Sequence, residues 1–322
     1  MAHPARGDIK VLESPAASAL SRSVEEYLDH VGARRLSLRT TEHYGWVLRR
    51  VLVPWCDEQK ITDPGQLDQR ALDRLSTWLI SPQRGLTPHS AHSYLRSVNH
   101  YLSWLRSEGE VPVGVKAQTP RLPKKLVDVL SREEIQQLED AAATERDKLM
   151  IRVMADTGMR LGELLGLTGG SLVERGRREF YLKVKGKGDK ERLVAIRPGL
   201  HQRLRRFIER SRPQDALTDN IFVGLRRRTR GEHRGERRGV RKEAVERMIH
   251  EAAYRAGLAK PARPHVLRHS FVTEALRRGV NPVTLAQIVG HSDLSMISRV
   301  YSHLSASDTH TAMMKMLSGD DD

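Results

Sequence analysis

Hydrophobic side chains recur at helical spacing along the first third of the chain. One run has members at i, i+3, i+4, i+7, i+8 and i+11, which form one face of a helix that is expected to bend at Pro54. This run comprises Tyr44, Val47, Leu48, Val51, Leu52 and Trp55. A shorter helix precedes it, with Ser23 as the expected N-cap and Glu25 and Glu26 in its first turn.

Two further helices complete the expected first domain. One covers residues 67–80, and the next begins at Thr87 as N-cap with Pro88 at the first helical position. Their inward positions are Leu72, Leu75 and Leu79, and then Ala91, Leu95, Val98, Leu102 and Leu105. The other side of the later helix carries Ser90, Ser93, Arg96 and Ser97, and its aromatic stripe is expected in the core: Tyr94, Tyr101 and Trp104. Four helices joined by short loops predict a small all-α domain.

The pattern changes in the second half. Ser131 and Glu134 form a capping box for a new helical region, which is expected to break at residues 156–158 and resume over 160–167. Residues 180–185 then alternate with period two, residues 186–190 form a turn, and 192–196 form the return strand. Helices are expected over 200–210, 241–256, 264–278, 281–290 and 306–317.

The chain is therefore expected to contain a flexible tail (1–21), a helical domain (22–108), a linker (109–130) and a second domain (131–322). The predicted fold is mainly α with a small antiparallel β-sheet, an N-terminal helical domain preceding a mixed α+β domain.

Charge narrows the class of partner. Lys and Arg number 55 against 40 for Asp and Glu, which gives a net charge of +15. Such an excess favours a polyanion, nucleic acid above all, although a merely basic protein is the simpler alternative. Eight arginines fall within residues 226–241, where a disordered or DNA-ordered loop is expected, with a solvated loop as the alternative.

Composition also excludes several classes of protein. The single cysteine cannot form an intrachain disulfide, and no Cys/His cluster has zinc-ligand spacing. No apolar run is long enough for a membrane span, and the first residues do not resemble a secretory signal. A cytoplasmic protein is expected.

The candidate chemistry lies near the C-terminus. His265 and Arg268 are spaced i, i+3 near a helix N-terminus, where anions are favoured, and His291 follows the glycine stop Gly290. Cleavage of a phosphodiester without a metal needs a nucleophile, positive charge at the phosphorus centre and a proton for the leaving oxygen. Each residue alone is weak support, since a lone His is more often structural and an Arg more often a surface charge.

Five motifs in order resemble the signature of the tyrosine recombinases, the lambda-integrase family. They are residues 157–164 (TGMRLGEL), residues 186–192 (GKGDKER), His265-x-x-Arg268-His269, Gly290-His291 and Tyr301-Ser302-His303. The resemblance implies that residues 22–108 form a helical core-binding (SAM-like) DNA-binding domain and that residues 131–322 form the catalytic domain. Residues 194–196, residues 296–299 and the Arg-rich stretch 225–241 depart from the usual pattern, at positions with no catalytic role in the family.

The resemblance also implies residue roles. Tyr301 is the nucleophile that forms a 3′-phosphotyrosyl bond, and Arg160 and Arg268 clamp the phosphate oxygens. The remaining roles are Lys187 as acid for the leaving 5′-oxygen, His265 as acid/base, His291 as a phosphate hydrogen-bond donor and Glu163 as support. Lys190 is the alternative acid; His269 and His303 are expected to be structural, and Tyr181 and Tyr254 lack the motif context. No cofactor, ATP or metal is implied.

The implied partners are double-stranded DNA at specific recombination sites, a Holliday junction and other copies of the chain in a tetramer, together with accessory proteins. The segment after Tyr301 would dock on a neighbouring protomer. Within the family, mobile-element (phage or transposon) integration and excision is favoured, with Xer-type chromosome or plasmid dimer resolution as the alternative. A type IB topoisomerase and a catalytically inactive DNA-binding relative are the competing classes.

Overall fold

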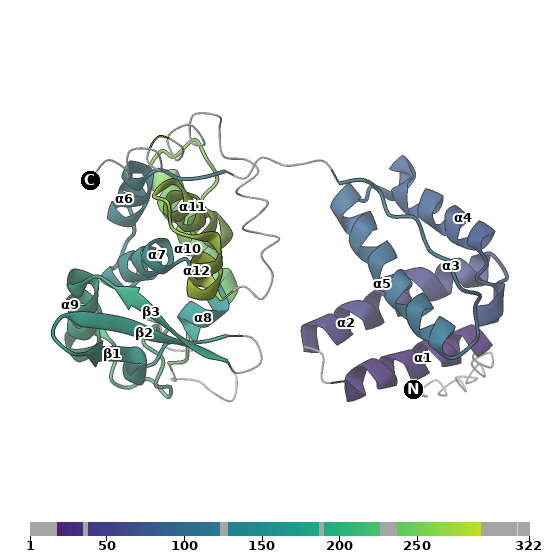
Figure 1. Ribbon diagram of the computed structural model, residues 1–322, viewed down its shortest axis with the longest axis horizontal. Helices are drawn as coiled ribbons and strands as arrows, with labels where there is room; N and C mark the ends of the chain where they lie inside the picture. The colour runs from purple at the N-terminus through teal and green to yellow at the C-terminus, as the bar shows by residue number, and fades with distance from the viewer. Residues whose placement is uncertain are drawn as a thin grey trace, which may run out of the picture. The chain divides into compact units, whose positions relative to one another are not determined.

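The computed structural model describes residues 18–34, 38–122, 128–186, 190–225 and 237–290, together with Met314. It separates into two compact units, residues 1–124 and 125–322 (Figure 1). Helices predominate, and a three-stranded antiparallel sheet lies in the second unit. The predicted mainly α fold with a small antiparallel sheet is confirmed.

The first unit is helical throughout its regular elements. These are α1 (Ala19–Ala33), α2 (Leu38–Val47), η1 (Leu48–Leu52), α3 (Val53–Glu58), η2 (Pro64–Gln66), α4 (Gln69–Ile80), η3 (Pro82–Arg84) and α5 (Pro88–Ser107). The expected start of α1 is wrong, because Ser18 is the N-cap and accepts a hydrogen bond from the Ser21 backbone N–H at 3.1 Å. Ser23 is buried instead, and its hydroxyl accepts a hydrogen bond from the phenol of Tyr101 at 2.9 Å.

The helix contains a π-helical segment just before Pro54, where a bend was expected. Between α2 and α3 the five residues of η1 adopt π-helical hydrogen bonding, and the backbone N–H of Val53 donates to the carbonyl of Leu48. Proline has no N–H and its ring crowds the carbonyl four residues earlier, so the widened turn just before Pro54 accommodates it. The apolar face persists through this segment, and Val47, Leu52 and Trp55 are all buried.

Helix α5 begins as its sequence predicts. The Thr87 hydroxyl accepts a hydrogen bond from the Ser90 N–H at 3.2 Å, and Pro88 occupies the first turn. The five leucine, valine and alanine positions expected inward are buried. Ser97, expected on the outer face, is buried as well and donates to the Ser93 carbonyl. Within the stretch expected as a linker, Val111 and Ala117 pack in the core of the first unit.

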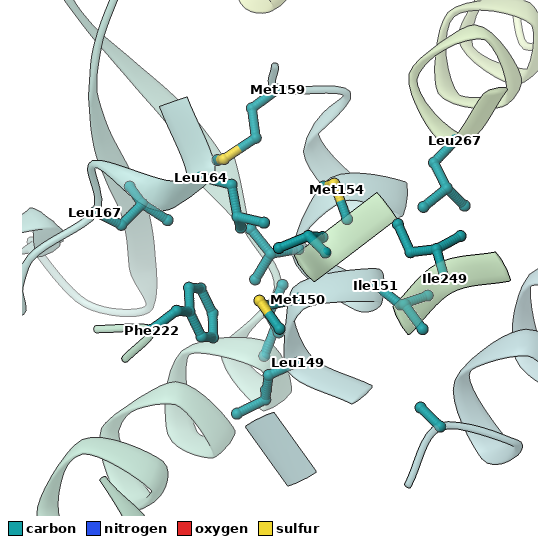
Figure 2. Close-up of a cluster of buried hydrophobic side chains, with 14 of the residues drawn as sticks. Leu149, Met150, Ile151, Met154, Met159, Leu164, Leu167, Phe222, Ile249 and Leu267 are labelled. Atoms are coloured by element: carbon teal, nitrogen blue, oxygen red, sulfur yellow. The ribbon is translucent and has the colours of Figure 1, made fainter. Parts of the chain in front are cut away.

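The second unit combines helices with the sheet. Its elements are α6 (Arg132–Asp140), α7 (Glu145–Thr157), α8 (Leu161–Leu165), η4 (Gly169–Ser171), β1 (Leu172–Arg175), β2 (Glu179–Lys185), β3 (Glu191–Ile196), α9 (Pro198–Arg206), η6 (Phe207–Ser211), α10 (Lys242–Arg255), α11 (Pro264–Arg277) and α12 (Pro282–Val289). Helix α7 is central, since it contacts α6, α8, α9, α11 and β3. Figure 2 shows its side chains Met150, Ile151 and Met154 among core residues from α8, α10 and α11.

The sheet has the order β1-β2-β3 with both pairs antiparallel. Leu182 pairs with Val194 and Phe180 with Ile196; on this face Leu182, Val194 and Ile196 are buried and Phe180 is partly buried. Strand β1 was not expected; it is four residues long and half exposed, which leaves little alternation to detect. Arg192 shares the face of Val194 and Ile196, because side chains two apart point to the same side of a strand.

Several predictions lie outside the described residues. They are the structures expected for residues 1–17, for most of the Arg-rich stretch, for Lys187 and for residues 291–313, which include His291 and Tyr301. No helix in the described part of the chain combines the length and apolarity that crossing a membrane requires.

Candidate active site

Arg160 is placed by the sharp end of α7. Gly158 ends that helix at a φ of +61°, and Arg160 caps the short helix α8 that follows. A Cβ atom at Gly158 would lie 2.4 Å from the Phe271 ring on α11, so only glycine permits this approach. The close approach brings the carbonyl of Gly158 within hydrogen-bond reach of Arg268 on the same helix.

Glu163 is the carboxylate at the centre of the site. Its oxygens accept hydrogen bonds from the Arg160 backbone N–H at 2.8 Å, from Arg160 Nη1 at 3.0 Å and from both terminal nitrogens of Arg192 at 2.7 and 3.1 Å. Its side chain is only 6% exposed. Burial by itself raises the pKa of Glu163, but the hydrogen bonds and charges of Arg192 and Arg160 outweigh it, so the pKa lies below its ordinary value.

Arg268 is buried in the same cluster. Its whole-residue exposure is 3%, and its guanidinium donates to the carbonyls of Gly158 and Val289, the latter at 2.8 Å. Burial lowers the pKa of Arg268 to about 10, and repulsion from Arg160 adds to the effect. The guanidinium therefore remains protonated at neutral pH, although its charge is poorly compensated by its surroundings.

The cluster carries an excess of positive charge. Three guanidinium groups (Arg160, Arg192 and Arg268) surround the Glu163 carboxylate among the described residues, and each also donates to a neutral backbone carbonyl. The side chain of Arg160 is 39% exposed, so solvent reaches one side of the cluster. A partly buried cationic site of this kind is stabilised by an anion with several acceptor oxygens, such as a phosphate.

The two histidines of α11 differ in their surroundings. His265 lies exposed in the first turn, at the end of the helix where backbone N–H groups are free to face an anion. His269 is half-buried, and burial, with repulsion from His265 and Arg268, lowers its pKa. The Nδ1 atom of His269 is buried and has no hydrogen-bond partner among the described residues.

The structure thus brings together Arg160, Glu163 and Arg268, which the sequence analysis selected. Lys187, His291 and Tyr301 lie outside the described residues. Arg192 was missed as a site residue, although a signal was present. It occupies an inward position of a strand whose other inward residues are apolar, and a buried arginine requires charged or polar partners.

A metal site is not evident in the part that the structure describes: there, no three His, Cys, Asp or Glu side chains gather as ligands would. The two alternative tyrosines lie elsewhere on the second unit. Tyr254 projects from α10 with 85% exposure, and Tyr181 on β2 donates its hydroxyl to Glu179.

Residues 128–308 match the model of the phage integrase family, which covers more than half of the chain. The chain belongs to that family: it is a tyrosine recombinase, an enzyme that cleaves and rejoins DNA. A similar relative is the tyrosine recombinase XerC of Xanthomonas campestris pv. campestris (strain B100), which is 30% identical over 90% of this chain and 86% of its own length.

Solved structures of tyrosine recombinases are similar in fold, among them a XerH complex and a lambda integrase tetramer. The XerH recombinase in its post-cleavage complex with palindromic difH substrate has a TM-score of 0.67 at 19% identity, and the match covers 90% of this chain and 83% of that one. The lambda integrase tetramer bound to a Holliday junction has a TM-score of 0.65 at 15% identity, covering 89% and 78%.

Proposed function

We propose that this recombinase cuts DNA at specific sites by attack of Tyr301 on a phosphate held by Arg160 and Arg268. The observation that carries the proposal is the excess of positive charge around Glu163. Arg160 and Arg268 come from segments more than 100 residues apart, yet they reach successive carbonyls at the end of α12. An anion placed among these guanidinium groups would offset both the desolvation and the mutual repulsion that lower the pKa of Arg268.

The reaction would proceed by exchange of one phosphate ester for another. The Tyr301 phenolate oxygen forms a bond to phosphorus while the bond from phosphorus to the 5′-oxygen breaks, leaving a 3′-phosphotyrosyl link and a free 5′-hydroxyl. The arginines stabilise the negative charge that develops on the non-bridging oxygens. Attack by a 5′-hydroxyl from another strand reverses these steps, so the phosphodiester is restored without an outside energy source.

Proton transfers would be assigned to the remaining residues. Lys187 gives a proton to the leaving 5′-oxygen, His265 takes or returns the phenol proton, and His291 donates a hydrogen bond to the phosphate. Their neighbours support this arrangement. A Cβ atom at Gly186 would lie 3.8 Å from Glu163 Oε1, and the carbonyl of Gly290 accepts from Arg160 at 3.0 Å. Both segments therefore approach the arginine cluster.

The assembly follows from the chemistry of strand exchange. Rejoining to a new partner requires two duplexes and a cut in each, which we assign to four copies of the chain acting through a Holliday junction. Residues 22–108 would serve as the DNA-binding domain and residues 131–322 as the catalytic domain, and of the expected linker over 109–130, Val111 and Ala117 pack with the first domain. The family's DNA-bound members, among them the XerH complex and the lambda integrase tetramer, support this arrangement.

The biological role proposed is Xer-type resolution of chromosome or plasmid dimers, with mobile-element integration as the second candidate. The mobile element was favoured from the sequence, on the basis of the Arg-rich stretch and the altered lead-in to Tyr301. The relatives lean the other way, since the XerC protein matches over 90% of this chain. Sequencing the DNA attached to the protein in cells would decide between a single chromosomal or plasmid site and the ends of a mobile element.

The experiment that tests the chemistry compares two tyrosines. The protein is incubated with a nicked suicide duplex carrying its recombination site, found by that sequencing. Tyr301→Phe is expected to abolish the covalent adduct and to retain DNA binding, because only the attacking oxygen is removed. Tyr254→Phe, a change at an 85% exposed phenol, is the matched control and is expected to form adduct as the natural protein does. An adduct with Tyr301→Phe would overturn the proposal.

A further inference from the structure

The last turn of α12 is held by three arginines at once. Its carbonyls at positions 288, 289 and 290 accept hydrogen bonds, in that order, from Arg192 Nε at 2.9 Å, Arg268 Nη2 at 2.8 Å and Arg160 Nη2 at 3.0 Å. The last carbonyls of a helix lack partners within the helix, and they lie at the negative end of its dipole. Three separate segments of the chain therefore meet at the residue that precedes His291.

Arg192 differs from the other two arginines in its partners. Its side chain is less exposed than that of Arg160, at 14% against 39%, and all three of its guanidinium nitrogens make hydrogen bonds. Nη1 and Nη2 contact the two oxygens of Glu163, and Nε donates to the carbonyl of Ile288. Arg192 therefore joins strand β3, helix α8 and the end of helix α12, and each of its three nitrogens already makes one hydrogen bond within the protein.

Gly290 packs closely against the Arg192 guanidinium, and Gly186 lies near it. At Gly290, where φ is +67°, a Cβ atom would lie 2.7 Å from Nη1 and 2.9 Å from Cζ, so the guanidinium occupies the space that a side chain would need. At Gly186 a Cβ atom would lie 3.6 Å from the same Nη1, which is ordinary contact. Each glycine directly precedes a proposed catalytic residue: Lys187 follows one, and His291 follows the other.

We propose that Arg192 is a positioning residue for DNA cleavage, an inference that rests on the function proposed above. Its planar guanidinium sets the two glycine turns from which Lys187 and His291 depart, and through Glu163 it also orients Arg160. Arg192 itself makes no contact with the phosphate. A displacement of about 1 Å at a reacting group can cost on the order of a hundredfold in rate, so a spacer of this kind is consequential.

Replacing Arg192 by lysine tests the role of the guanidinium shape separately from the role of its positive charge. Arg192→Lys retains the positive charge beside Glu163, but one ammonium group cannot bond both carboxylate oxygens and Ile288 while filling the flat space beside Gly290. The matched control is Arg152→Lys. Arg152 also binds a buried glutamate, Glu139, and the side-chain exposures of that pair are 16% and 5%, against 14% and 6% for Arg192 and Glu163.

The first measurement is the single-turnover rate of adduct formation on saturating suicide DNA, together with the Kd for DNA and the unfolding temperature. Arg192→Lys is expected to slow cleavage by about tenfold or more, with Kd changed by less than about threefold. Arg152→Lys is expected to cleave within about threefold of the natural rate whatever its unfolding temperature. Natural cleavage rates for a folded Arg192→Lys, or equal losses in both variants, would overturn the proposal.

The second measurement uses a duplex in which the scissile 5′-oxygen is replaced by sulfur. A thiolate leaves without needing a proton, so cleavage of this duplex does not depend on a correctly placed Lys187. The deficit of Arg192→Lys is expected to shrink by at least about fivefold on the sulfur duplex, whereas a general loss of folding would persist. An undiminished deficit would overturn the link from Arg192 to Lys187.

Gly290→Ala tests the same contact without changing Arg192. The new methyl group displaces the guanidinium, so Gly290→Ala is expected to cleave more slowly than the natural protein. The double variant Gly290→Ala with Arg192→Lys is expected to cleave at a rate within about threefold of the slower single variant. Additive losses would overturn the proposal, and a natural cleavage rate for Gly290→Ala would overturn it even if Arg192→Lys did not fold. Failure of the natural protein to form any adduct would instead overturn the proposed function, so the two failures are distinguishable.

Discussion

Two buried glutamates of the second unit have nearly the same immediate partners and a different electrostatic outcome. Glu139 on α6 is bound by Arg152 and Arg203, and Glu163 on α8 is bound by Arg160 and Arg192. Both carboxylates have side chains about equally shielded from solvent, at 5% and 6%. The number of ion pairs made by the carboxylate therefore does not distinguish the two sites.

The two sites differ in the other groups that their arginines contact. Around Glu139, Arg203 also pairs with Glu145 at 3.0 Å, and Arg152 and Arg197 pair with Asp156 at 3.6 and 2.8 Å. That cluster sets three guanidinium groups against three carboxylates. Among the described residues, three guanidinium groups around Glu163 face a single carboxylate, and each also donates to a neutral backbone carbonyl.

An anion site among arginines is indicated by an excess of guanidinium groups over carboxylates. A balanced network satisfies itself and contributes to the folded state, whereas an unbalanced one retains a field that an added anion can neutralise. Burial is the main cause of the lowered pKa of Arg268, and repulsion from Arg160 and Arg192 adds the part that reflects the imbalance. Three experiments can break or sharpen the distinction.

The largest expected effect is on the cleavage rate of an Arg268 variant whose stability is retained. Arg268→Gln is expected to reduce the rate of adduct formation about a thousandfold, because one donor to the developing charge is lost. It is expected to leave the unfolding temperature nearly unchanged, since the amide can still donate and a buried, repelled charge is removed. Arg152→Gln is expected to show the reverse pattern, with lower stability and a natural cleavage rate. Loss of stability without loss of cleavage in Arg268→Gln would break the comparison.

The next effect concerns the central carboxylate. Glu163→Gln is expected to reduce the free energy of unfolding of the second unit by about 3 kcal/mol at neutral pH, because breaking a buried pair leaves charges uncompensated. Because Arg160 is partly exposed, this value is at the low end of the roughly 3–5 kcal/mol that is typical of a broken buried ion pair. All four tryptophans lie within residues 1–124, so unfolding of the second unit is followed by circular dichroism or hydrogen exchange rather than by tryptophan fluorescence.

The pH dependence of that loss has a definite sign. The pKa of Glu163 is lowered in the folded protein, so its stabilisation is present above the ordinary value of 4.5 and disappears as pH falls through the folded value. The difference in stability between natural protein and Glu163→Gln should therefore be largest near neutral pH and shrink in acid. A difference that grew as pH fell would contradict the assigned ion pairs.

The smallest effect is stabilisation by a simple anion. Millimolar pyrophosphate is expected to raise the stability of the second unit by about 1 kcal/mol, through binding at the unbalanced cluster. Arg268→Gln should lose the increment and Arg152→Gln should keep it, as thermal unfolding with and without pyrophosphate would show. Equal loss in both variants would mean that the anion binds by general surface charge.

Local signals account for most of what was predicted correctly. Thr87 with Pro88, Ser131 with Glu134, and Gly158 and Gly290 each act within one helical turn, so their effect can be read from neighbouring letters. The start of α1 was missed because Ser18 and Ser23 are equally suitable caps locally. The choice depends on Tyr101, whose buried hydroxyl donates to Ser23 from 78 residues away.

The sequence by itself determined the helical and strand periods, the glycine stops and the set of side chains that resembles a tyrosine recombinase. These depend on short-range sterics and on residue type. Only the tertiary structure decided the balance of charge, because the partners of Arg192 lie 29 and 96 positions away, at Glu163 and Ile288. Which guanidinium groups are committed to structure, and which remain for a phosphate, is settled by packing in three dimensions.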